Sequence, residues 1–349
     1  MPTLQAEPLR NFSRSLFVAA GVPDAEAVVV SSSLVDANLC GHDSHGVIRI
    51  PQYVGFVREG KLFCNVPLTK LNETPALLSA DAGWGLGQVQ SYRLLDILLP
   101  KAKALGIAAG TMRKCGHIGR LGEYAEWAAE RGCAFMATVN SHGSGQRVAP
   151  PGGTAGRLST NPLCLGAPTP TDPLVLDIGT SAAAEGKVRV CFQKGEKTPD
   201  GWLLDHQGKP TNDPGVLYNE PRGTLLPFGG AQAYKGFGLS LLLDALAGGL
   251  SGGSSSRADA PLPGLGNTVL FVLFSIDQFA GSEHFLKESG TLAGFVRSTP
   301  RAKGVNAITL PGDPERLTKQ KRLVDGIAIP DGTWSLLTKL AGELKVTVP

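Results

Sequence analysis

Apolar residues recur three and four positions apart in several stretches of the chain, which is the spacing of one face of an α-helix. The clearest such stretch covers residues 22–40, where Asp24 fits an N-cap and Gly41 follows as a stop. The same pattern predicts helices at residues 88–105, 118–131, 234–248 and, twice over, 314–346. The two ends of the chain are therefore expected to be mainly helical.

Short aliphatic runs between glycines and prolines predict strands. They lie at residues 76–80, 107–113, 133–139, 163–165, 174–178 and 268–276. A helix at residues 234–248 interrupts them, and a flexible loop is expected at 251–266. We therefore predict an α/β protein in which residues 114–297 form a β-rich lobe, while the terminal segments pack together as a second lobe.

Composition narrows the class of protein. A chain of 349 residues with 42% hydrophobic content is long enough for two domains. Its formal charge of +3 gives no support for nucleic-acid binding. The first residues lack the apolar stretch of a signal peptide, and no run is apolar enough to span a membrane. Six cysteines without a CxxC spacing fit reduced thiols, so we expect a soluble, cytoplasmic protein.

The densest polar cluster is GHDSHG at residues 41–46. These side chains are of metal-binding types, but no similar cluster supplies further ligands, so no metal site is predicted. Acid–base chemistry is a second interpretation, because Arg49 follows His45 by four residues. Pro51 favours a single turn between them and a new helix that starts near Pro51. A guanidinium beside an imidazole suits a 2-oxo acid, since one binds the carboxylate and the other transfers a proton. A solvated surface turn is the third interpretation.

The glycine-rich segments do not fit the usual nucleotide or hydrolase motifs. GWGLGQV at residues 83–89 opens a helix but is spaced GxGxG rather than GxGxxG, so a conventional Rossmann site is not predicted. The GxSxG match at residues 249–253 follows a helix instead of a strand, which argues against a serine hydrolase. His117 and Arg120 at a helix start fit either anion binding or capping, and Cys115 does not establish a thiol nucleophile.

Small hydroxyl and amide side chains gather where predicted strands end. They occur in NSHG at residues 140–143, STNP at 159–162 and DIGTS at 177–181, and Tyr234-Lys235 opens a helix. Such loops offer N–H groups and hydroxyls to phosphates and riboses. Each one alone also fits an ordinary turn. Their repetition within one lobe is what favours nucleotide binding.

Taken together, the chain resembles the type-2 malate/L-lactate dehydrogenase family, a group of NAD(P)-dependent enzymes unrelated to Rossmann lactate dehydrogenases. Through GHDSHG and HIGRLG it is most similar to the hydroxycarboxylate dehydrogenase B group. The resemblance covers nearly the whole chain, in the order GHDSHGVIRIPQYV, GWGLGQV, GHIGRLGEYAEWAAERG, STNP, LVLDIGTSAAAEGKVRV, PDGWLLDHQGKPTNDP, LLPFGG, YKGFGLSLLLDALAGGLSGG and LPGDPE.

The resemblance implies a fold and a reaction. It implies a non-Rossmann NAD(P)-binding domain on a mixed, largely antiparallel sheet at residues 114–297. It also implies a substrate and dimerisation domain from residues 1–113 and 298–349, and a homodimer. The expected reaction interconverts a small 2-oxo acid and its 2-hydroxy acid. Two competing hypotheses are a reductase of cyclic imino acids and a non-catalytic ligand-binding protein.

Carried over by motif, the family's roles fall on individual residues. His45 would be the general acid/base, and Asp177 would lie near the reacting group and orient or polarise His45. Arg49 would bind the substrate carboxylate, with Ser44 and His117 in the same site. Cofactor contacts would come from Asn140, Ser141, Ser159, Thr160, Asn161, Thr180, Ser181, Ala182, Tyr234, Lys235, Pro311, Gly312 and Asp313.

Two segments depart from the family pattern. LSTNP stands where GTNP is usual, and GGAQAYKG stands where a shorter GGYKG is common. Both belong to the expected rim of the cofactor site. The preference between NAD and NADP, and the identity of the acid, are therefore left open.

Overall fold

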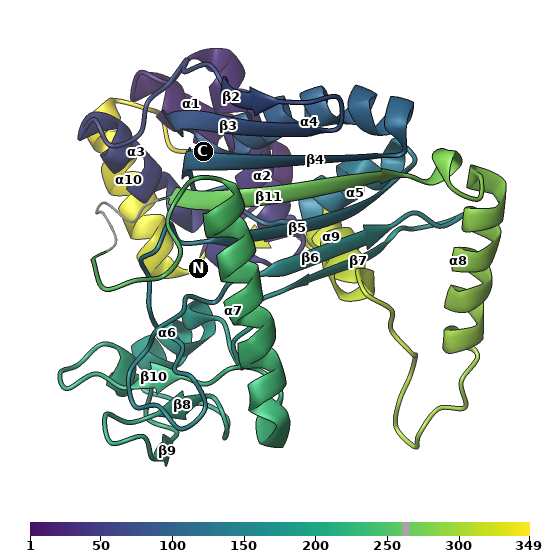
Figure 1. Cartoon of the computed structure of the whole chain (residues 1–349). Coiled ribbons are helices and arrows are strands. Elements are labelled where there is room, and N and C mark those ends of the chain that lie inside the picture. The colour runs from purple at the N-terminus through teal and green to yellow at the C-terminus, as the bar shows by residue number, and fades with distance from the viewer. Residues whose placement is uncertain (260–265) are drawn as a thin grey trace.

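A mixed seven-stranded sheet runs through the protein in the order β2-β3-β4-β11-β5-β6-β7 (Figure 1). This computed structural model describes residues 1–259 and 266–349. Neighbouring strands are antiparallel except β3 and β4, which run parallel. The strands are β2 (Thr69–Glu73), β3 (Leu77–Gly85), β4 (Ile107–Gly116), β5 (Cys133–Asn140), β6 (Leu163–Ala167), β7 (Leu174–Ile178) and β11 (Gly266–Ser275).

Helices cover both faces of this sheet. On one face α4 (Gly87–Leu105) and α5 (Gly122–Glu130) bury their apolar sides against the strands, and on the other lies α7 (Ala233–Leu250) (Figure 1). Close packing of α4 depends on Gly110 of β4, because a Cβ there would lie 2.7 Å from a methyl group of Leu94 and of Leu98. The sheet and its two-sided cover form the main core.

The terminal segments share a second core. It joins α1 (Ala6–Ala19), α2 (Asp24–Leu39), α3 (Ile50–Arg58) and α10 (Asp331–Leu344). The two ends of the chain also pair directly, since β1 (Thr3–Leu4) is antiparallel to β12 (Ile327–Ala328). The helix α9 (Asp313–Asp325) precedes β12. The expected packing of the two terminal segments against each other is thus observed.

A smaller unit lies below the sheet in the view of Figure 1. It contains α6 (Glu185–Lys194), the two-residue strands β8 (Leu203–Leu204), β9 (Pro210–Thr211) and β10 (Thr224–Leu225), and a 3-10 turn η3 (Pro214–Leu217) around a few buried side chains. Two further 3-10 turns are η4 (Gly230–Gln232) before α7 and η5 (Ile276–Gln278) after β11. The helix α8 (Ser282–Arg297) then projects from the opposite end of the sheet, and none of its residues is buried.

Most predicted elements are present, with boundaries shifted by a few residues. The predicted helix at 118–131 begins only at Gly122, and the predicted strand at 268–276 begins at Gly266. Four of the longer elements lack a counterpart in the sequence prediction, namely α1, α6, α8 and β2, and so do the two-residue strands β1, β8, β9, β10 and β12. All five residues of β2 and most of α8 are exposed, so neither element buries an apolar face against the rest of the described chain. By contrast, α1 does carry buried Leu9, Phe12 and Leu16 at helical spacing.

Two predictions about organisation need qualification. The sheet takes β2, β3 and most of β4 from before residue 114, because β4 itself spans the expected boundary between 113 and 114. The division into domains therefore stays a prediction. Residues 260–265 of the expected loop at 251–266 lie outside the described residues. No described helix is long and apolar enough to cross a membrane.

Candidate active site

The segment that carries His45 joins α2 to α3 through two short 3-10 turns, η1 (Asp43–His45) and η2 (Val47–Arg49). The sequence predicts a single turn here, and that is wrong, because Gly46 between the two turns is extended. The expected new helix near Pro51 is present, since α3 begins at Ile50. The Arg49 side chain folds back, and its Nε donates to the Ser44 carbonyl at 2.7 Å. Ser44, His45 and Arg49 are thereby kept in one compact loop.

This loop is built around Asn38, a buried residue near the end of α2. Asn38 Nδ2 donates to the Asp43 carboxylate at 2.6 Å, and its Oδ1 accepts the Val47 N–H at 2.8 Å. A Cβ at position 46 would lie 2.2 Å from the same Oδ1, so Gly46 lets the loop close over Asn38. The sequence analysis did not select Asn38, because its partners follow it in an irregular loop.

We predict that Asn38→Ala lowers the free energy of unfolding by about 2–4 kcal/mol, because the buried Val47 N–H loses its hydrogen-bond acceptor and the contact to Asp43 is removed. Chemical denaturation measures this change. Asn72→Ala, on the exposed strand β2, is the matched control and is expected to change stability by less than about 0.5 kcal/mol. Equal stability of the two variants would contradict the role of Asn38.

The helix α9, in the C-terminal segment, holds the same loop from outside. Arg322 donates to both Asp43 carboxylate oxygens, at 2.6 and 3.1 Å, and to the Asn38 carbonyl at 2.5 Å. About two turns before Arg322, Glu315 Oε1 lies 3.3 Å from His42 Nε2. The His45 loop is therefore fixed between α2 and α9.

His117, which follows β4, lies against His45. The two imidazole rings are stacked, with centroids 5.3 Å apart and an interplanar angle of 21°. Ser44 Oγ is 3.0 Å from His45 Nδ1. Burial, and then the nearby Arg49 guanidinium, lower the pKa of His45 to about 3 and the pKa of His117 well below its ordinary value. Both imidazoles are neutral near pH 7.

Asp177 lies in β7 and faces α5. Its Oδ2 accepts the Gly122 N–H at 2.8 Å. Burial raises the pKa of this carboxyl, and the nearby His42 and Arg120 offset part of the effect. Within the described residues, the side chain that hydrogen-bonds His45 is Ser44, and Asp177 makes no such bond. The orienting role expected for Asp177 therefore stays a prediction.

Strand pairing explains why these distant segments meet. Gly116 at the end of β4 pairs with Gly266, and Asn140 at the end of β5 pairs with Thr268. Leu163, the first residue of β6, pairs with Ile178 at the end of β7. The segments that carry His117, Asn140 and Ser141, Ser159 to Asn161, and Asp177 to Ala182 therefore lie at one end of the sheet.

Several expected cofactor residues bond to each other through their side chains. Asn140 Nδ2 and Asn161 Nδ2 donate to the two carboxylate oxygens of buried Asp244, at 3.1 and 2.9 Å. Ser159 Oγ donates to Asn161 Oδ1 at 2.5 Å, and Thr180 Oγ1 donates to the Asn161 carbonyl at 2.9 Å. These side chains fix the loops in place. The sequence gives no sign that Asp244, inside an apolar helix, is their common partner.

The other expected cofactor residues fall into two groups. Ser181, Ala182, Pro311 and Asp313 already make hydrogen bonds inside the protein, and Gly312 caps α9 with a positive φ of 93°. Ser141 and Thr160 are partly buried, while Tyr234 and Lys235 are exposed. The accessible group is the part of the set that can reach a bound molecule through its side chains.

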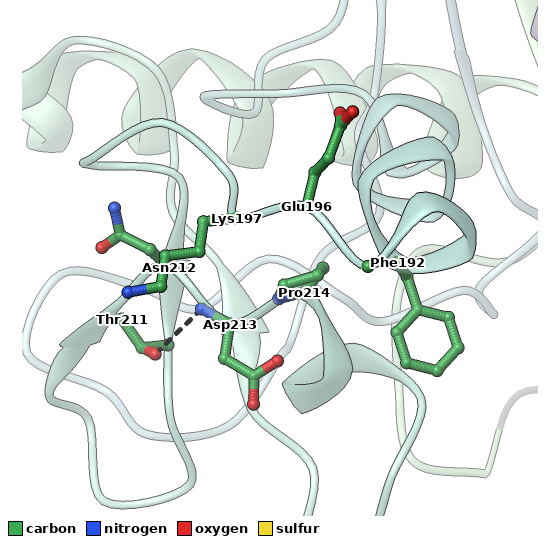
Figure 2. Close-up of a pocket in the computed structure, with 8 residues that line it drawn as sticks. Phe192, Glu196, Lys197, Thr211, Asn212, Asp213 and Pro214 are labelled. Atoms are coloured by element: carbon green, nitrogen blue, oxygen red, sulfur yellow. Dashed lines mark hydrogen bonds between the residues drawn. The ribbon is translucent and has the colours of Figure 1, made fainter.

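A hollow of about 630 Å³ lies elsewhere, in the small unit below the sheet (Figure 2). It is lined by Phe192, Gly195, Glu196, Lys197, Thr211, Asn212, Asp213 and Pro214, none of which is a predicted site residue. This hollow is therefore separate from the residues around His45. Among the residues that the structure describes, no group of three or more His, Cys, Asp or Glu side chains is arranged to hold a metal ion.

The fold and the loop chemistry together define a class, and comparison with known proteins gives its name. Residues 4–338 match the model of the malate/L-lactate dehydrogenase family. The chain belongs to this family, as its motifs predict.

Curated relatives agree along almost the full length. An L-lactate dehydrogenase of Cupriavidus necator is 33% identical, with 97% of each chain covered. Hydroxycarboxylate dehydrogenase B of Escherichia coli is also 33% identical, over 97% of this chain and 93% of its own. The predicted likeness to the hydroxycarboxylate dehydrogenase B group is confirmed.

Solved structures share the fold. A putative malate/lactate dehydrogenase from Escherichia coli superposes with a TM-score of 0.92 at 32% identity, covering 99% of this chain and 96% of its own. A delta1-piperideine-2-carboxylate reductase from Pseudomonas syringae has a TM-score of 0.83 at 30% identity, covering 98% and 100%. The same architecture thus occurs under two reaction names.

Proposed function

We propose that this protein is an NAD(P)-dependent oxidoreductase that interconverts a small 2-oxo acid and its 2-hydroxy acid, with His45 as general acid/base. The observation that carries the proposal is the compact loop that holds Ser44, His45 and Arg49 together, with His117 stacked on His45. An anion-binding guanidinium next to a proton-transferring imidazole is what reduction of a 2-oxo acid requires. Names of relatives in the family support the same reaction class.

Arg49 is the proposed partner of the substrate carboxylate. Its Nε donates to the Ser44 carbonyl and its Nη1 to Gln52 Oε1, while Nη2 makes no hydrogen bond to any described residue. The two bonds hold the guanidinium in place and leave donors of its planar fork for a ligand. A substrate carboxylate held there brings its 2-oxo or 2-hydroxy group toward the His45 imidazole.

His45 moves the proton. Its pKa of about 3 makes it a neutral base, ready to accept the proton of a 2-hydroxy acid that is being oxidised. A bound substrate carboxylate adds a negative charge nearby, which favours the imidazolium and raises the pKa. That shift lets His45 take up a proton and donate it to the oxygen of a 2-oxo acid in the reverse direction. Asp177 is proposed to support this proton transfer from β7.

The loops at the same end of the sheet fit a dinucleotide. His142, in the loop after β5, is buried against Trp84 with ring centroids 5.0 Å apart, and its Nδ1 has no partner among the described residues. Lys114 and Arg257 lie close enough to lower the pKa of His142, after burial, so the surroundings are cationic. An unpaired ring nitrogen and nearby cations suit a nucleotide with phosphates.

We propose that the accessible members of the predicted set, Ser141, Thr160, Tyr234 and Lys235, would contact the cofactor, while the Asn140–Asp244–Asn161 network holds the loops. The nicotinamide supplies or receives the hydride when bound. The antiparallel pairing around β5, β6 and β7 supports a non-Rossmann cofactor domain at residues 114–297. NAD and NADP both remain candidates, because the segments that depart from the family pattern belong to the expected rim.

A homodimer is part of the proposal. The outer side of α7 exposes Leu242, Leu246 and Leu250, which recur every four residues and therefore form one stripe, and α8 exposes Phe295. A second copy of the chain is the occupant we propose for these surfaces, and the terminal segments would contribute the substrate domain. All six cysteines are free thiols, which supports a cytoplasmic location.

The experiment that tests the proposal follows the ultraviolet absorbance of NADH or NADPH with purified protein and a panel of 2-oxo acids and cyclic imines. Oxidation of the cofactor with a 2-oxo acid supports the proposal and identifies the cofactor. Activity with a cyclic imine alone would favour the second candidate, a cyclic imino acid reductase, which the likeness to the Pseudomonas syringae enzyme supports. If no compound of the panel causes oxidation of the cofactor, the result would favour a ligand-binding protein.

The pH profile is a further prediction. Because the pKa of His45 is about 3, its base form is already complete well below neutral pH. At saturating NAD(P)⁺, kcat/KM for a 2-hydroxy acid is therefore expected to be constant from about pH 5 to about pH 8. An imidazole with an ordinary pKa would instead make kcat/KM fall about tenfold per pH unit below about 6.5. Such a fall, measured by initial rates, would show that His45 is not held neutral.

A further inference from the structure

Tyr53 of α3 is buried beneath the active site and touches it through its hydroxyl group. Its Oη lies 2.5 Å from Nδ1 of His117, and the side chain is only 2% exposed. On the other side, Gln88 Nε2 donates to the same Oη at 3.4 Å. Three side chains from α3, α4 and the loop after β4 therefore form a short line that ends at the His117 ring.

The donors in this line determine where the His117 proton lies. The Gly119 backbone N–H is directed at His117 Nδ1 at 3.4 Å, and a backbone N–H can only donate. Nδ1 must then be the unprotonated nitrogen, so the Tyr53 hydroxyl also donates to it. A neutral imidazole with a bare Nδ1 carries its proton on Nε2. The bond from Gln88 agrees with this direction, because the Tyr53 oxygen accepts while its hydrogen points at His117.

The protonation states fit the same arrangement. Burial, then Arg49 and His45, lower the pKa of His117 well below its ordinary value, so the ring is neutral at physiological pH. Burial raises the pKa of Tyr53 to about 12, so its hydroxyl keeps its proton. No described residue forms a hydrogen bond with His117 Nε2, which is left for a ligand.

We propose that Tyr53 is a positioning residue that fixes His117 as a neutral hydrogen-bond donor through Nε2, aimed at an oxygen of the substrate. This inference rests on the proposed function and assigns a different role to each of the two stacked imidazoles. His45 transfers the proton, and His117 donates a hydrogen bond without changing its charge. The oxygen it serves belongs to the carboxylate or the 2-oxo group of the acid, both of which accept hydrogen bonds.

The direct test is the tautomer of His117, measured by NMR on protein labelled with ¹⁵N-histidine. Spectra of wild type and His117→Gln assign the signal, and spectra of Tyr53→Phe show the effect of removing the hydroxyl. We expect the Nε2–H form in wild type and a larger fraction of the Nδ1–H form in Tyr53→Phe than in wild type. A wild-type Nδ1–H form would overturn the proposal, as would a tautomer that Tyr53→Phe leaves unchanged.

Kinetics provide the second readout. Tyr53→Phe is expected to lower kcat about 10- to 100-fold, as loss of a group that orients a functional imidazole commonly does, while the KM of the cofactor stays within about twofold. His117→Gln, whose amide nitrogen falls near Nε2, should keep at least about tenfold more activity than His117→Asn, whose amide falls near Nδ1. The reverse order of these two variants would overturn the proposal.

A control separates this role from simple packing. Tyr92→Phe removes another largely enclosed hydroxyl, on α4 against Tyr124, and should leave kcat and the His117 tautomer unchanged. Equal losses in both variants would mean that Tyr53 acts only through packing. The NMR measurement needs no substrate, so it determines the His117 tautomer even if the wild-type protein reduces no 2-oxo acid. Failure of the proposed reaction can therefore be distinguished from failure of the proposed role of Tyr53.

Discussion

The His45→Ala variant is expected to fold normally and to turn over a 2-oxo acid about 10²- to 10⁴-fold more slowly than wild type, which is the usual cost of losing a general acid/base. The structure indicates that His45→Ala still folds. The His45 ring contacts only Ser44 and His117 among the contacts described above, while the loop itself is held by Asn38 and Arg322. Single-turnover rates with saturating cofactor measure the loss at the chemical step.

The matched control is His206→Ala, an exposed histidine between β8 and β9. It should retain wild-type turnover, and both variants should bind the reduced cofactor with unchanged affinity in a fluorescence titration. Wild-type turnover in a folded His45→Ala protein would remove this residue from the mechanism.

Arg49→Gln is expected to lower kcat/KM for 2-oxo acids roughly 30- to 700-fold. That range corresponds to about 2–4 kcal/mol for leaving a substrate carboxylate without its charged partner. The loss should fall mainly on KM, since the carboxylate is bound in both the ground state and the transition state. Steady-state kinetics over a range of acid concentrations separates the two constants.

Arg58→Gln, eight residues past the start of α3, is the control for Arg49. Arg58 forms an exposed ion pair with Glu343 at 3.2 Å, so its loss should cost less than about 1 kcal/mol of stability and leave kcat/KM unchanged. A substrate analogue without a carboxylate should be reduced at the same slow rate by wild type and Arg49→Gln. If that analogue distinguished the two proteins, Arg49 would be acting on the reaction centre instead of the carboxylate.

The sequence predicts the elements that bury one face. The helices α2 and α4 appear within two residues of their expected ends because apolar spacing and the glycines that follow agree there. The predicted N-cap at Asp24 is wrong, because Pro23 is the N-cap and Asp24 is the first residue of α2. The exposed α8 and β2 bury no such face, so the pattern that identifies the other elements does not single them out. The pairing of β11 between β4 and β5 joins strands far apart in the chain, and no local signal encodes it.

The candidate site divides in a similar way. Ser44, His45 and Arg49 could be predicted together because they are neighbours in sequence. Tyr53 could not, because a tyrosine at helical spacing looks like an ordinary core residue, and the nitrogen that its hydroxyl meets belongs to His117, 64 residues later. The sequence places Asn140 and Asn161 at strand ends, but their carboxylate partner Asp244 is visible only once the chain is folded.

The contact of Arg322 with Asp43 also bears on protein synthesis. The two residues are 279 positions apart, so a growing chain exposes Asp43 long before Arg322 has been made. At typical elongation rates that interval lasts about 15–55 s. During it the His45 loop lacks its contact with α9 and is held by Asn38 and by the bond from Arg49 to the Ser44 carbonyl. Catalytic competence is therefore expected to appear last, after the ribosome has passed α9, and a nascent chain halted before that helix would be inactive even with its sheet complete.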